Sequence, residues 1–226
     1  MENPLELIIE KLSGTQEGET ISYIDGIYSE LGEAQKKWYE ESGFTCTDGC
    51  GSCCHNFEPD LLESEVLYMA AWIISFDEQK AKQLAEGDVE RFFPAAEDEG
   101  VTSKTCIFYN HKNPYHCSIY GGRPFICRLF GASGAKDKNG KLCWKPCKFY
   151  PAEKLAQFKV PLTHRQYNLE EVQSIFGTSP PVMSDVMEKV VNNNPGKTET
   201  VPLRKILPET IRRLYWILSL TANSSS

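Results

Sequence analysis

Apolar residues recur at helical spacing along much of the chain, and these runs predict its main elements. The N-terminal run comprises Ile21, Ile24, Ile27 or Tyr28, Leu31 and Trp38. Residues at this spacing share one face of an α-helix, and a glycine directly after such a run is a common C-terminal cap. The pattern therefore predicts a long helix that ends before Gly43.

A second helix is predicted after residue 60. Its apolar stripe is formed by Leu62, Val66, Met69 and Ile73. Asp60 precedes this stripe and Glu63 follows three residues later, a spacing typical of a capping box at a helix N-terminus. We therefore expect the helix to begin with a side-chain cap from Asp60.

A third helix is predicted over 77–93, where the inward-facing residues are Leu84, Val89 and Phe92. Pro94 would stop it, because a proline cannot donate the next helical hydrogen bond. Helical periodicity returns over 168–176, over 182–191 and after Pro208. Both ends of the chain are thus expected to be helical.

Between residues 100 and 150 the periodicity is lost. Gly, Pro, Asn and Lys interrupt short aromatic pieces such as CIFYN (106–110) and CWKPCKFY (143–150). A loop-rich stretch of this length cannot easily form its own core, and a bound metal is one common remedy. We therefore predict a mainly α fold, with a helical scaffold around a loop-rich, cysteine-ligated metal core and little β structure.

Length and composition place the chain among ordinary globular proteins. Its 226 residues are 41% hydrophobic and 24% charged, which suits one domain or a domain with an elaborated end. We expect a helical segment over 1–45, a cysteine-rich metal-binding region over 46–150 and a second helical segment over 151–226, packed on the same domain. The first residues resemble no secretory signal, and the longest near-apolar run, 67–76, is too short to span a bilayer. We expect a cytoplasmic protein without a membrane contact.

The cysteines change this picture. All nine lie between Cys46 and Cys147, and none lies in the flanking segments. In a reducing cytosol such thiols indicate metal or redox chemistry, and an odd number fits a closed set of disulfides badly. The alternative to a metal or redox role is that the cysteines are buried and act as small hydrophobic residues. Their clustering in one part of the chain disfavours this alternative.

The spacing Cys46-x3-Cys50-x2-Cys53 lets thiolates converge on one metal, with Gly51 in a tight turn. Adjacent residues rarely direct both side chains at one tetrahedral ion, so the doublet with Cys54 suggests two neighbouring sites or a polynuclear cluster. The remaining candidate ligands are Cys106, Cys117, Cys127, Cys143 and Cys147. Since an ion or cubane takes four thiolates, nine cysteines allow two sites and one spare.

A basic segment accompanies the cysteines. Residues 104–148 hold nine Lys or Arg against one acid, Asp137, a net charge of +8 in a chain of −7. A centre held by four thiolates carries excess negative charge, and nearby cations stabilise it. Arg123 and Arg128 flank Cys127, and we predict that they stabilise the centre from just outside its ligands. A nucleic-acid surface is the alternative reading of the charge.

Three pieces of the sequence together resemble the YkgJ-type cysteine-cluster family, a CxxxCxxCC domain described as zinc- or iron-chelating. They are CTDGCGSCC at 46–54, Cys106 with the two residues after it, and CSIYGGRPFICR at 117–128. The resemblance covers about residues 46–130. It implies as ligands Cys46, Cys50, Cys53, Cys54, Cys106, Cys117 and Cys127. Three features depart from the family pattern: Gly121 replaces a frequent acidic residue, the gap between Cys106 and Cys117 is long, and Cys143 and Cys147 lie beyond the motif.

The residues allow both an iron–sulfur cluster, expected as [4Fe-4S], and zinc. The doublet, the number of thiols and the aromatic, basic surroundings favour iron–sulfur. We expect a metal-binding protein with a structural, redox or metal-handling role and a protein partner. Nucleic acid is a less favoured partner.

An enzyme is the first alternative function. Flagellin lysine N-methylases have a similar cluster, so an iron–sulfur-dependent protein methylase that uses S-adenosylmethionine is one candidate by resemblance. The Cys46-x3-Cys50-x2-Cys53 spacing also occurs in radical S-adenosylmethionine enzymes, but the βα alternation of their barrel is missing from this sequence. A zinc-stabilised module that binds nucleic acid or a protein is the second alternative.

Overall fold

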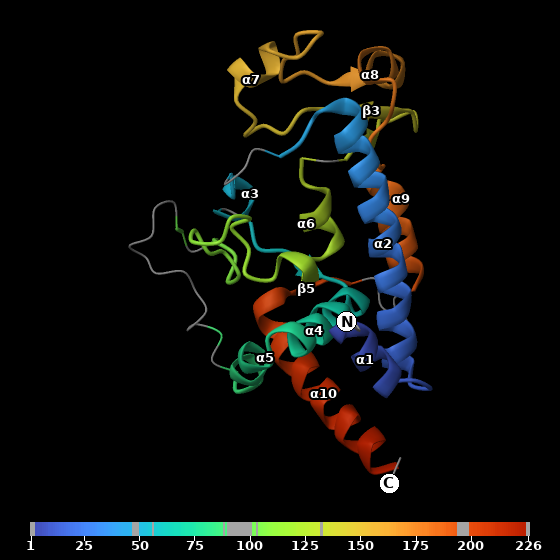
Figure 1. The fold of residues 1–226 in the computed structure, drawn as a ribbon, viewed down its shortest axis with the longest axis vertical. Helices are drawn as coiled ribbons and strands as arrows, with labels where there is room; N and C mark the ends of the chain where they lie inside the picture. Colours follow the sequence, from blue (N-terminus) through green and yellow to red (C-terminus); the bar gives the residue numbers. More distant parts are fainter. Residues whose placement is uncertain are drawn as a thin grey trace.

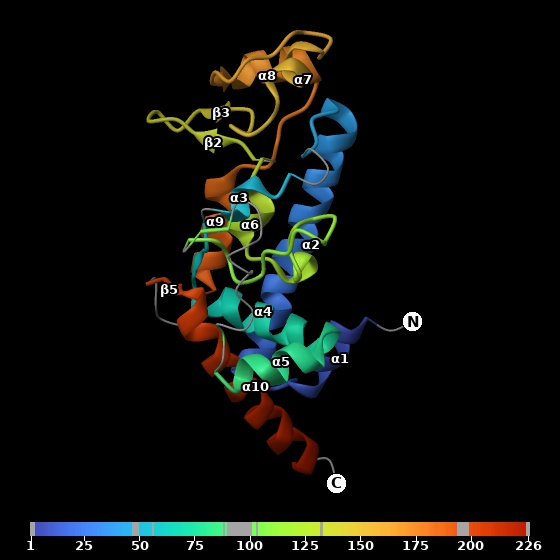
Figure 2. The same cartoon turned by 90° about the vertical axis from the view of Figure 1, so that its left-hand side faces the viewer.

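The computed structural model describes residues 3–46, 50–55, 57–87, 89, 101–102, 104–131, 133–193 and 199–224. The molecule is elongated, and helix α2 (Gln16–Ser42) runs along it (Figures 1 and 2). A helical layer lies at one end of α2, and a small sheet with two short helices lies at the other. The cysteine-bearing loops lie between these two ends.

Helix α2 confirms the first predicted helix. Ile21, Ile24 and Trp38 are fully buried along one face. The helix begins after Thr15, whose side chain accepts a hydrogen bond from a backbone N–H in the first turn. It ends at Gly43, which has a φ of 66°. This left-handed conformation is one that glycine adopts without steric cost, so Gly43 is the predicted cap.

The helical layer around the lower end of α2 holds the larger hydrophobic core. Its helices are α1 (Pro4–Lys11), α4 (Glu63–Phe76), α5 (Glu78–Ala85) and α10 (Leu203–Ser224). Helix α4 lies at the centre of this layer and contacts α1, α2, α5 and α10. Ten of its fourteen residues are buried, so it is apolar on nearly all sides, as expected of a core helix.

The predicted capping box of α4 is wrong. Asp60 lies in the short strand β1 (Asp60–Leu61), which pairs with β5 (Val201–Pro202) in antiparallel register. Leu62 is the residue before the helix, and it provides no side-chain cap. Because Asp60 and Leu61 are paired with β5, the helix begins only after Leu62, and Asp60 lies two residues before the N-cap position.

Two other predicted boundaries also change. Helix α5 ends at Ala85, and Gly87, with a φ of 87°, lies in the turn that follows. The rest of the predicted helix, apart from Val89, lies outside the described residues. Helix α10 begins at Leu203, five residues before Pro208, and continues through the proline. Leu203 and Leu207 are buried in the core, and this packing offsets the one helical hydrogen bond that a proline removes.

A second, aromatic core lies at the other end of α2. The strands there are β2 (Ala135–Lys136), β3 (Leu142–Trp144) and β4 (Tyr167–Asn168), in that order and antiparallel. The helices are α7 (Ala152–Ala156) and α8 (Leu169–Phe176), and α9 (Met183–Asn192) runs beside α2. Trp38 and Trp144 meet edge to face at 5.7 Å and are both fully enclosed.

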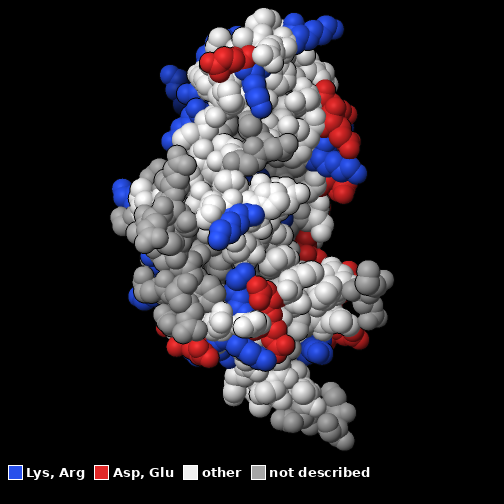
Figure 3. Space-filling model, turned by 60° about the vertical axis from the view of Figure 1, so that its left-hand side comes forward, with Lys and Arg blue, Asp and Glu red and all other residues white. Residues whose placement is uncertain are grey.

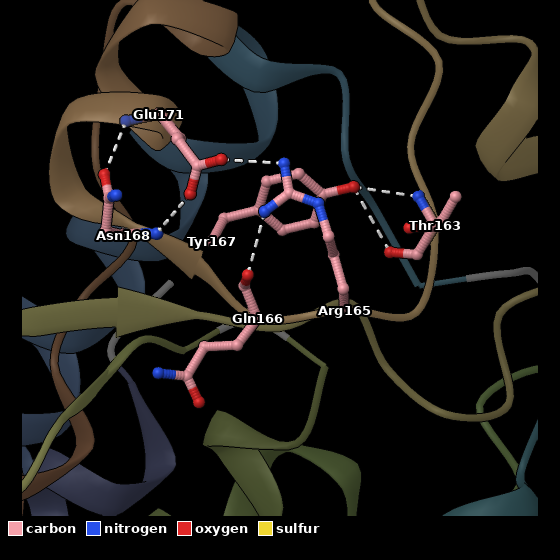
Figure 4. Close-up of polar contacts among 6 residues, drawn as sticks. All are labelled: Thr163, Arg165, Gln166, Tyr167, Asn168 and Glu171. Atoms are coloured by element: carbon pink, nitrogen blue, oxygen red, sulfur yellow. Dashed lines mark hydrogen bonds and ion pairs between the residues drawn. The ribbon is translucent and has the colours of Figure 1, made fainter.

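The start of α8 shows why its predicted range is nearly the observed one (Figure 4). Asn168 and Glu171 form a reciprocal capping box with two bonds of 2.9 Å. Arg165 donates to the Glu171 carboxylate at 2.7 Å, and its guanidinium lies 3.9 Å from the centre of the Tyr167 ring. All these contacts are local in sequence, so the pattern could be recognised from the sequence.

The loop-rich middle has three short helical pieces. They are α3 (Ser52–His55), the 3-10 turn η2 (Tyr120–Gly122) and α6 (Phe125–Leu129). The strands of the described chain are two or three residues long, which confirms the mainly α fold with little β structure. Within the described ranges, no helix has both the length and the hydropathy needed to cross a membrane.

Candidate metal centre

One cavity of about 540 Å³ lies between α2, α3, α6 and the loop that precedes η2. Its lining includes seven cysteines: Cys46, Cys50, Cys53, Cys54, Cys106, Cys117 and Cys127. Nine cysteines are described, and no disulfide joins any of them. The structure thus brings together seven thiols from four separate segments of the chain, and leaves Cys143 and Cys147 outside the cavity lining.

Helix α3 carries the cysteine doublet. Gly51 directly before it has a φ of 50°, and its carbonyl accepts a hydrogen bond from the Cys54 N–H at 2.9 Å. A Cβ atom on Gly51 would lie 2.5 Å from Nδ1 of His116. Both the backbone conformation and the close approach therefore require glycine here.

The Sγ atoms of Cys53 and Cys54 are 4.0 Å apart. The hydrogen bond from Cys54 lowers the pKa of Cys53 to about 7, and the same contact raises the pKa of Cys54. The contact thus favours the thiolate form of Cys53 over that of Cys54. A thiolate is the form that binds metal.

Cys106 is held beside the doublet by backbone contacts. Its N–H donates to the Cys54 carbonyl at 3.1 Å. The next N–H, of Ile107, donates to the Glu58 carboxylate at 3.0 Å, and Arg204 of α10 forms a 2.7 Å ion pair with the same carboxylate. Because Glu58 connects the loop to α10, the helical layer determines where Cys106 lies. Burial raises the pKa of Cys106 to about 12.

Cys117 and Cys127 complete the deep wall of the cavity. Cys117 is 7% exposed and lies in an isolated β-bridge with Tyr109. Cys127 lies on α6, and burial raises the pKa of its thiol well above the usual range, as do the neighbouring Cys106 and Cys117. Neutral thiols are therefore favoured here, and only a strong cation can offset the cost of ionising several of them together.

A buried polar cluster positions α6, and sequence reasoning missed it. Glu65 of α4 is 2% exposed, and its Oε1 accepts a hydrogen bond from the Tyr28 hydroxyl and another from the Phe125 N–H, both 2.8 Å long. The second bond satisfies a backbone donor at the start of α6, where helical partners are missing. No local signal predicts this contact, because Tyr28 and Glu65 come from different helices.

Arg128 contacts the backbone around Cys127. Its Nε donates to the Arg123 carbonyl at 2.7 Å, and its terminal nitrogen donates to the Gly121 carbonyl. Its guanidinium also lies 4.2 Å from the centre of the Tyr28 ring. These contacts shape the turn that presents Cys127, so the observed bonds give Arg128 an orienting role for this segment.

Arg123 lies in the cavity lining itself. It donates to the carbonyls of Tyr120 at 2.9 Å and Cys127 at 3.3 Å, and its guanidinium lies 3.5 Å from the centre of the Tyr120 ring. Its positive charge acts to lower the pKa of four thiols, those of Cys46, Cys53, Cys117 and Cys127. Both arginines line the cavity and donate to backbone carbonyls. They differ in that the charge of Arg123 acts on the thiols, whereas the guanidinium of Arg128 lies over the Tyr28 ring.

The presence of glycine at position 121, where the family that the sequence resembles often has an acidic residue, has a steric explanation. A Cβ on Gly121 would lie 2.9 Å from the indole of Trp72, and one on Gly122 would lie 2.8 Å from it. Trp72 comes from α4 and stacks on Phe76 at 4.7 Å. The two glycines therefore let η2 pack directly on this indole.

Aromatic side chains form much of the remaining cavity lining. They are Tyr39, Phe57, Phe108, Tyr115, Tyr120 and Phe130. Phe108 and Tyr120 belong to the family-like motif, and sequence reasoning did not single out the other four. Two pairs are in contact: Tyr115 stacks on Tyr120 at 4.2 Å, and Phe57 meets Phe130 at 5.2 Å. In the sequence, the short aromatic pieces of the loop-rich segment were the feature that could have pointed to these side chains.

Cysteine thiols are the kind of ligand that a thiophilic metal prefers. In this structure, however, the seven sulfurs do not converge on one point. Metal–sulfur bonds of ~2.3 Å in a tetrahedron separate the sulfurs by ~3.8 Å. The Cys53 and Cys54 sulfurs, at 4.0 Å, come near this spacing. Among the described residues, no three Cys, His, Asp or Glu side chains are arranged as a ready ion site.

Cys143 and Cys147 are placed differently from each other. Cys143 lies in β3, is 8% exposed and pairs in register with Ala135 and Asn168. Cys147 is half-buried in the following loop, near the end of α6, where a Cβ on Gly131 would lie 3.6 Å from its own. The C-x3-C pair of the sequence is thus divided between a strand and the neighbourhood of the cavity.

A family model with the description "Putative zinc- or iron-chelating domain" (CxxCxxCC) matches residues 45–161. The match confirms the resemblance seen in the sequence and extends past its predicted end at about residue 130, so that it includes Cys143 and Cys147. Comparisons with curated proteins and with solved structures found no match.

Proposed function

The chain belongs to this zinc- or iron-chelating CxxCxxCC family, and on that basis we propose that it binds its metal through thiolates of the seven-cysteine cavity. The convergence of seven thiols on one cavity is the observation that carries the proposal. A cavity that served only for packing would not need seven thiols, several of them with pKa values raised by burial.

We favour an iron–sulfur cluster, expected as [4Fe-4S], as the resident group. The cavity of about 540 Å³ is much larger than the space inside one set of four thiolates around a single ion. The lining also holds more than four thiols, together with aromatic rings and the cationic Arg123. Bound there, a cluster supplies one-electron chemistry whose potential depends on nearby charge and hydrogen bonds to sulfur. The cysteines would hold it, and Arg123 would offset its negative charge.

Zinc is the second candidate, because four of the thiolates that line the cavity would suffice for one closed tetrahedral ion. A zinc centre would be structural and redox-silent, and would hold together the four segments that surround the cavity.

We also propose a protein as the partner, in preference to nucleic acid. On the face drawn in Figure 3, Lys and Arg side chains are interspersed with acidic and uncharged ones. Members of the basic segment have local partners: Lys136 forms a 2.5 Å ion pair with Asp185, and Arg123 and Arg128 donate to backbone carbonyls. A continuous basic surface, which nucleic acid would favour, has less support.

Metal and sulfide analysis of anaerobically purified protein, with its visible spectrum, tests the proposal. We expect at least one equivalent of iron or zinc per chain. Acid-labile sulfide and a broad absorption near the blue end of the spectrum would identify the cluster, and zinc without sulfide would identify the second candidate. A combined iron and zinc content below about half an equivalent per chain, in protein never exposed to chelator or oxidant, would refute metal binding.

A further inference from the structure

We propose that the cysteines form two four-thiolate sites, an inner one and an outer one, and that Cys147 completes the outer site although it lies outside the cavity lining. The inner set is Cys54, Cys106, Cys117 and Cys127. The outer set is Cys46, Cys50, Cys53 and Cys147. Cys143 is then the spare thiol. This inference rests on the proposed metal binding and adds the number of sites and the ligands of each.

The inner set is connected through the buried wall of the cavity. Cys106 and Cys54 are joined by a backbone hydrogen bond of 3.1 Å. The Tyr109–Cys117 bridge brings Cys117 back to the loop that carries Cys106. Cys127 lines the same cavity as Cys106 and Cys117. These four thiols therefore surround the inner part of the cavity.

The outer set is held by aromatic packing between two distant segments. Phe44, two residues before Cys46, stacks on Tyr150 at 4.7 Å and meets Trp144 edge to face at 4.9 Å. Tyr150 and Trp144 lie on either side of Cys147 in the chain. The segment that carries Cys46 is thus packed on the segment that carries Cys147.

The position of Cys147 beside the cavity agrees with this packing. Cys46, Cys50 and Cys53 line the cavity. Cys147 lies near the end of α6, which carries a cavity-lining cysteine, since a Cβ on Gly131 would lie 3.6 Å from the Cβ of Cys147. Three cysteines of each set are half-buried. The fourth is exposed in the outer set (Cys46) and buried in the inner set (Cys117), so the outer set lies nearer to solvent.

The doublet connects the two sets. Cys53 and Cys54 are adjacent in α3, with sulfurs 4.0 Å apart, and each would bind a different centre. This division accounts for two neighbouring cysteines that one tetrahedral ion would rarely use together. Because the outer ligands include the exposed Cys46 and the inner ones include the buried Cys117, the outer metal should exchange faster than the inner one.

Zinc titration of the full-length apoprotein tests the division, with zinc content and the rate of release to a chromogenic chelator as readouts. We expect two equivalents in the parent, released in a fast and a slow phase. Cys147→Ser should hold one equivalent and lose the fast phase, and Cys117→Ser should lose the slow phase. Cys143→Ser is the matched control, because it alters the other member of the C-x3-C pair, and it should keep both equivalents.

Cys147 lies in a surface loop, so its variant tests the proposal even if Cys117→Ser does not fold. Circular dichroism of each apoprotein checks folding, and Cys46→Ser serves as a second outer variant with the same expected loss. Full zinc content and both phases in Cys147→Ser would overturn the inference. A parent with a single equivalent would also overturn it while leaving the proposed metal binding intact, whereas a parent that binds neither zinc nor iron would refute the proposed function itself.

Discussion

The guanidinium of Arg128 lies 4.2 Å from the centre of the Tyr28 ring, and Tyr28 in turn donates its hydroxyl proton to the buried Glu65. This relationship connects α2, α4 and the segment that carries Cys127. The same arginine holds two backbone carbonyls of that segment. The position of one predicted ligand thus depends on a polar cluster that contains no sulfur.

We expect Arg128→Gln to destabilise the fold. The variant loses charge-assisted hydrogen bonds to the carbonyls of Arg123 and Gly121, and the loss of one bond of this kind costs about 1.5–3 kcal/mol. For a chain of this size that corresponds to a fall in melting temperature of about 3–12 °C. Thermal unfolding of the apoprotein measures it. Arg165→Gln is the control, since Arg165 also lies over a tyrosine, but at the exposed surface, and it should cause little change.

A different result is expected for Arg123→Gln. Arg123 lines the cavity, and its charge favours the ionised form of four neighbouring thiols. Removing that charge should weaken metal retention about 10- to 100-fold, the usual size of effects from residues just outside the ligands. A chelator series on the loaded protein measures it. Lys112→Gln removes an exposed charge from the same loop as a control, and equal retention in both variants would contradict the prediction.

Gly121→Ala should cost stability because of the close approach of Trp72. A Cβ at this position would lie 2.9 Å from the indole, so the ring or η2 must shift, at a cost of about 1–3 kcal/mol. Gly26→Ala in α2 should have the opposite sign, stabilising the helix by about 0.5–1 kcal/mol, since nothing lies within 4 Å of its Cβ position. Urea unfolding of both variants checks the two signs. Stabilisation in both would show that Trp72 does not restrict this position.

The periodic helices could be predicted from sequence because their signals are local. The buried face of α2 follows from the spacing of Ile21, Ile24 and Trp38, and its end follows from Gly43. Asp60 was misassigned because its extended backbone depends on pairing with Pro202, more than a hundred residues away. A local capping pattern carries no information about such a partner.

The same distinction applies to the candidate site. The cysteines themselves were visible as a clustered, spaced set, and the cavity brings together the seven that the family resemblance implied. The contacts that position them were not visible: Glu65 reaches Phe125, Glu58 reaches Arg204, and Phe44 reaches Tyr150. Each contact joins segments far apart in the chain, and neither composition nor spacing predicts such a contact.

The last prediction concerns pH and Glu65. Burial raises the pKa of this carboxyl, although hydrogen bonds from the Phe125 N–H and the Tyr28 hydroxyl act to lower it. A group whose pKa is higher in the folded than in the unfolded state binds its proton more tightly when folded. Its contribution to stability is therefore fully present below the unfolded pKa and is lost as the pH rises through the folded pKa.

Glu65→Gln should remove this dependence, because a glutamine oxygen can still accept both hydrogen bonds and carries no charge. We expect the stability of the variant relative to the parent to improve steadily as the pH rises from about 4 toward neutrality. Urea unfolding of the apoprotein at a series of pH values measures the difference. Glu33→Gln, an exposed position on α2, should leave the pH profile of the parent unchanged. A stability difference for Glu65→Gln that is constant over the same range would show that the carboxyl titrates alike in the folded and unfolded chain, and would place the buried Arg128–Tyr28–Glu65 cluster in a more hydrated environment than its geometry indicates.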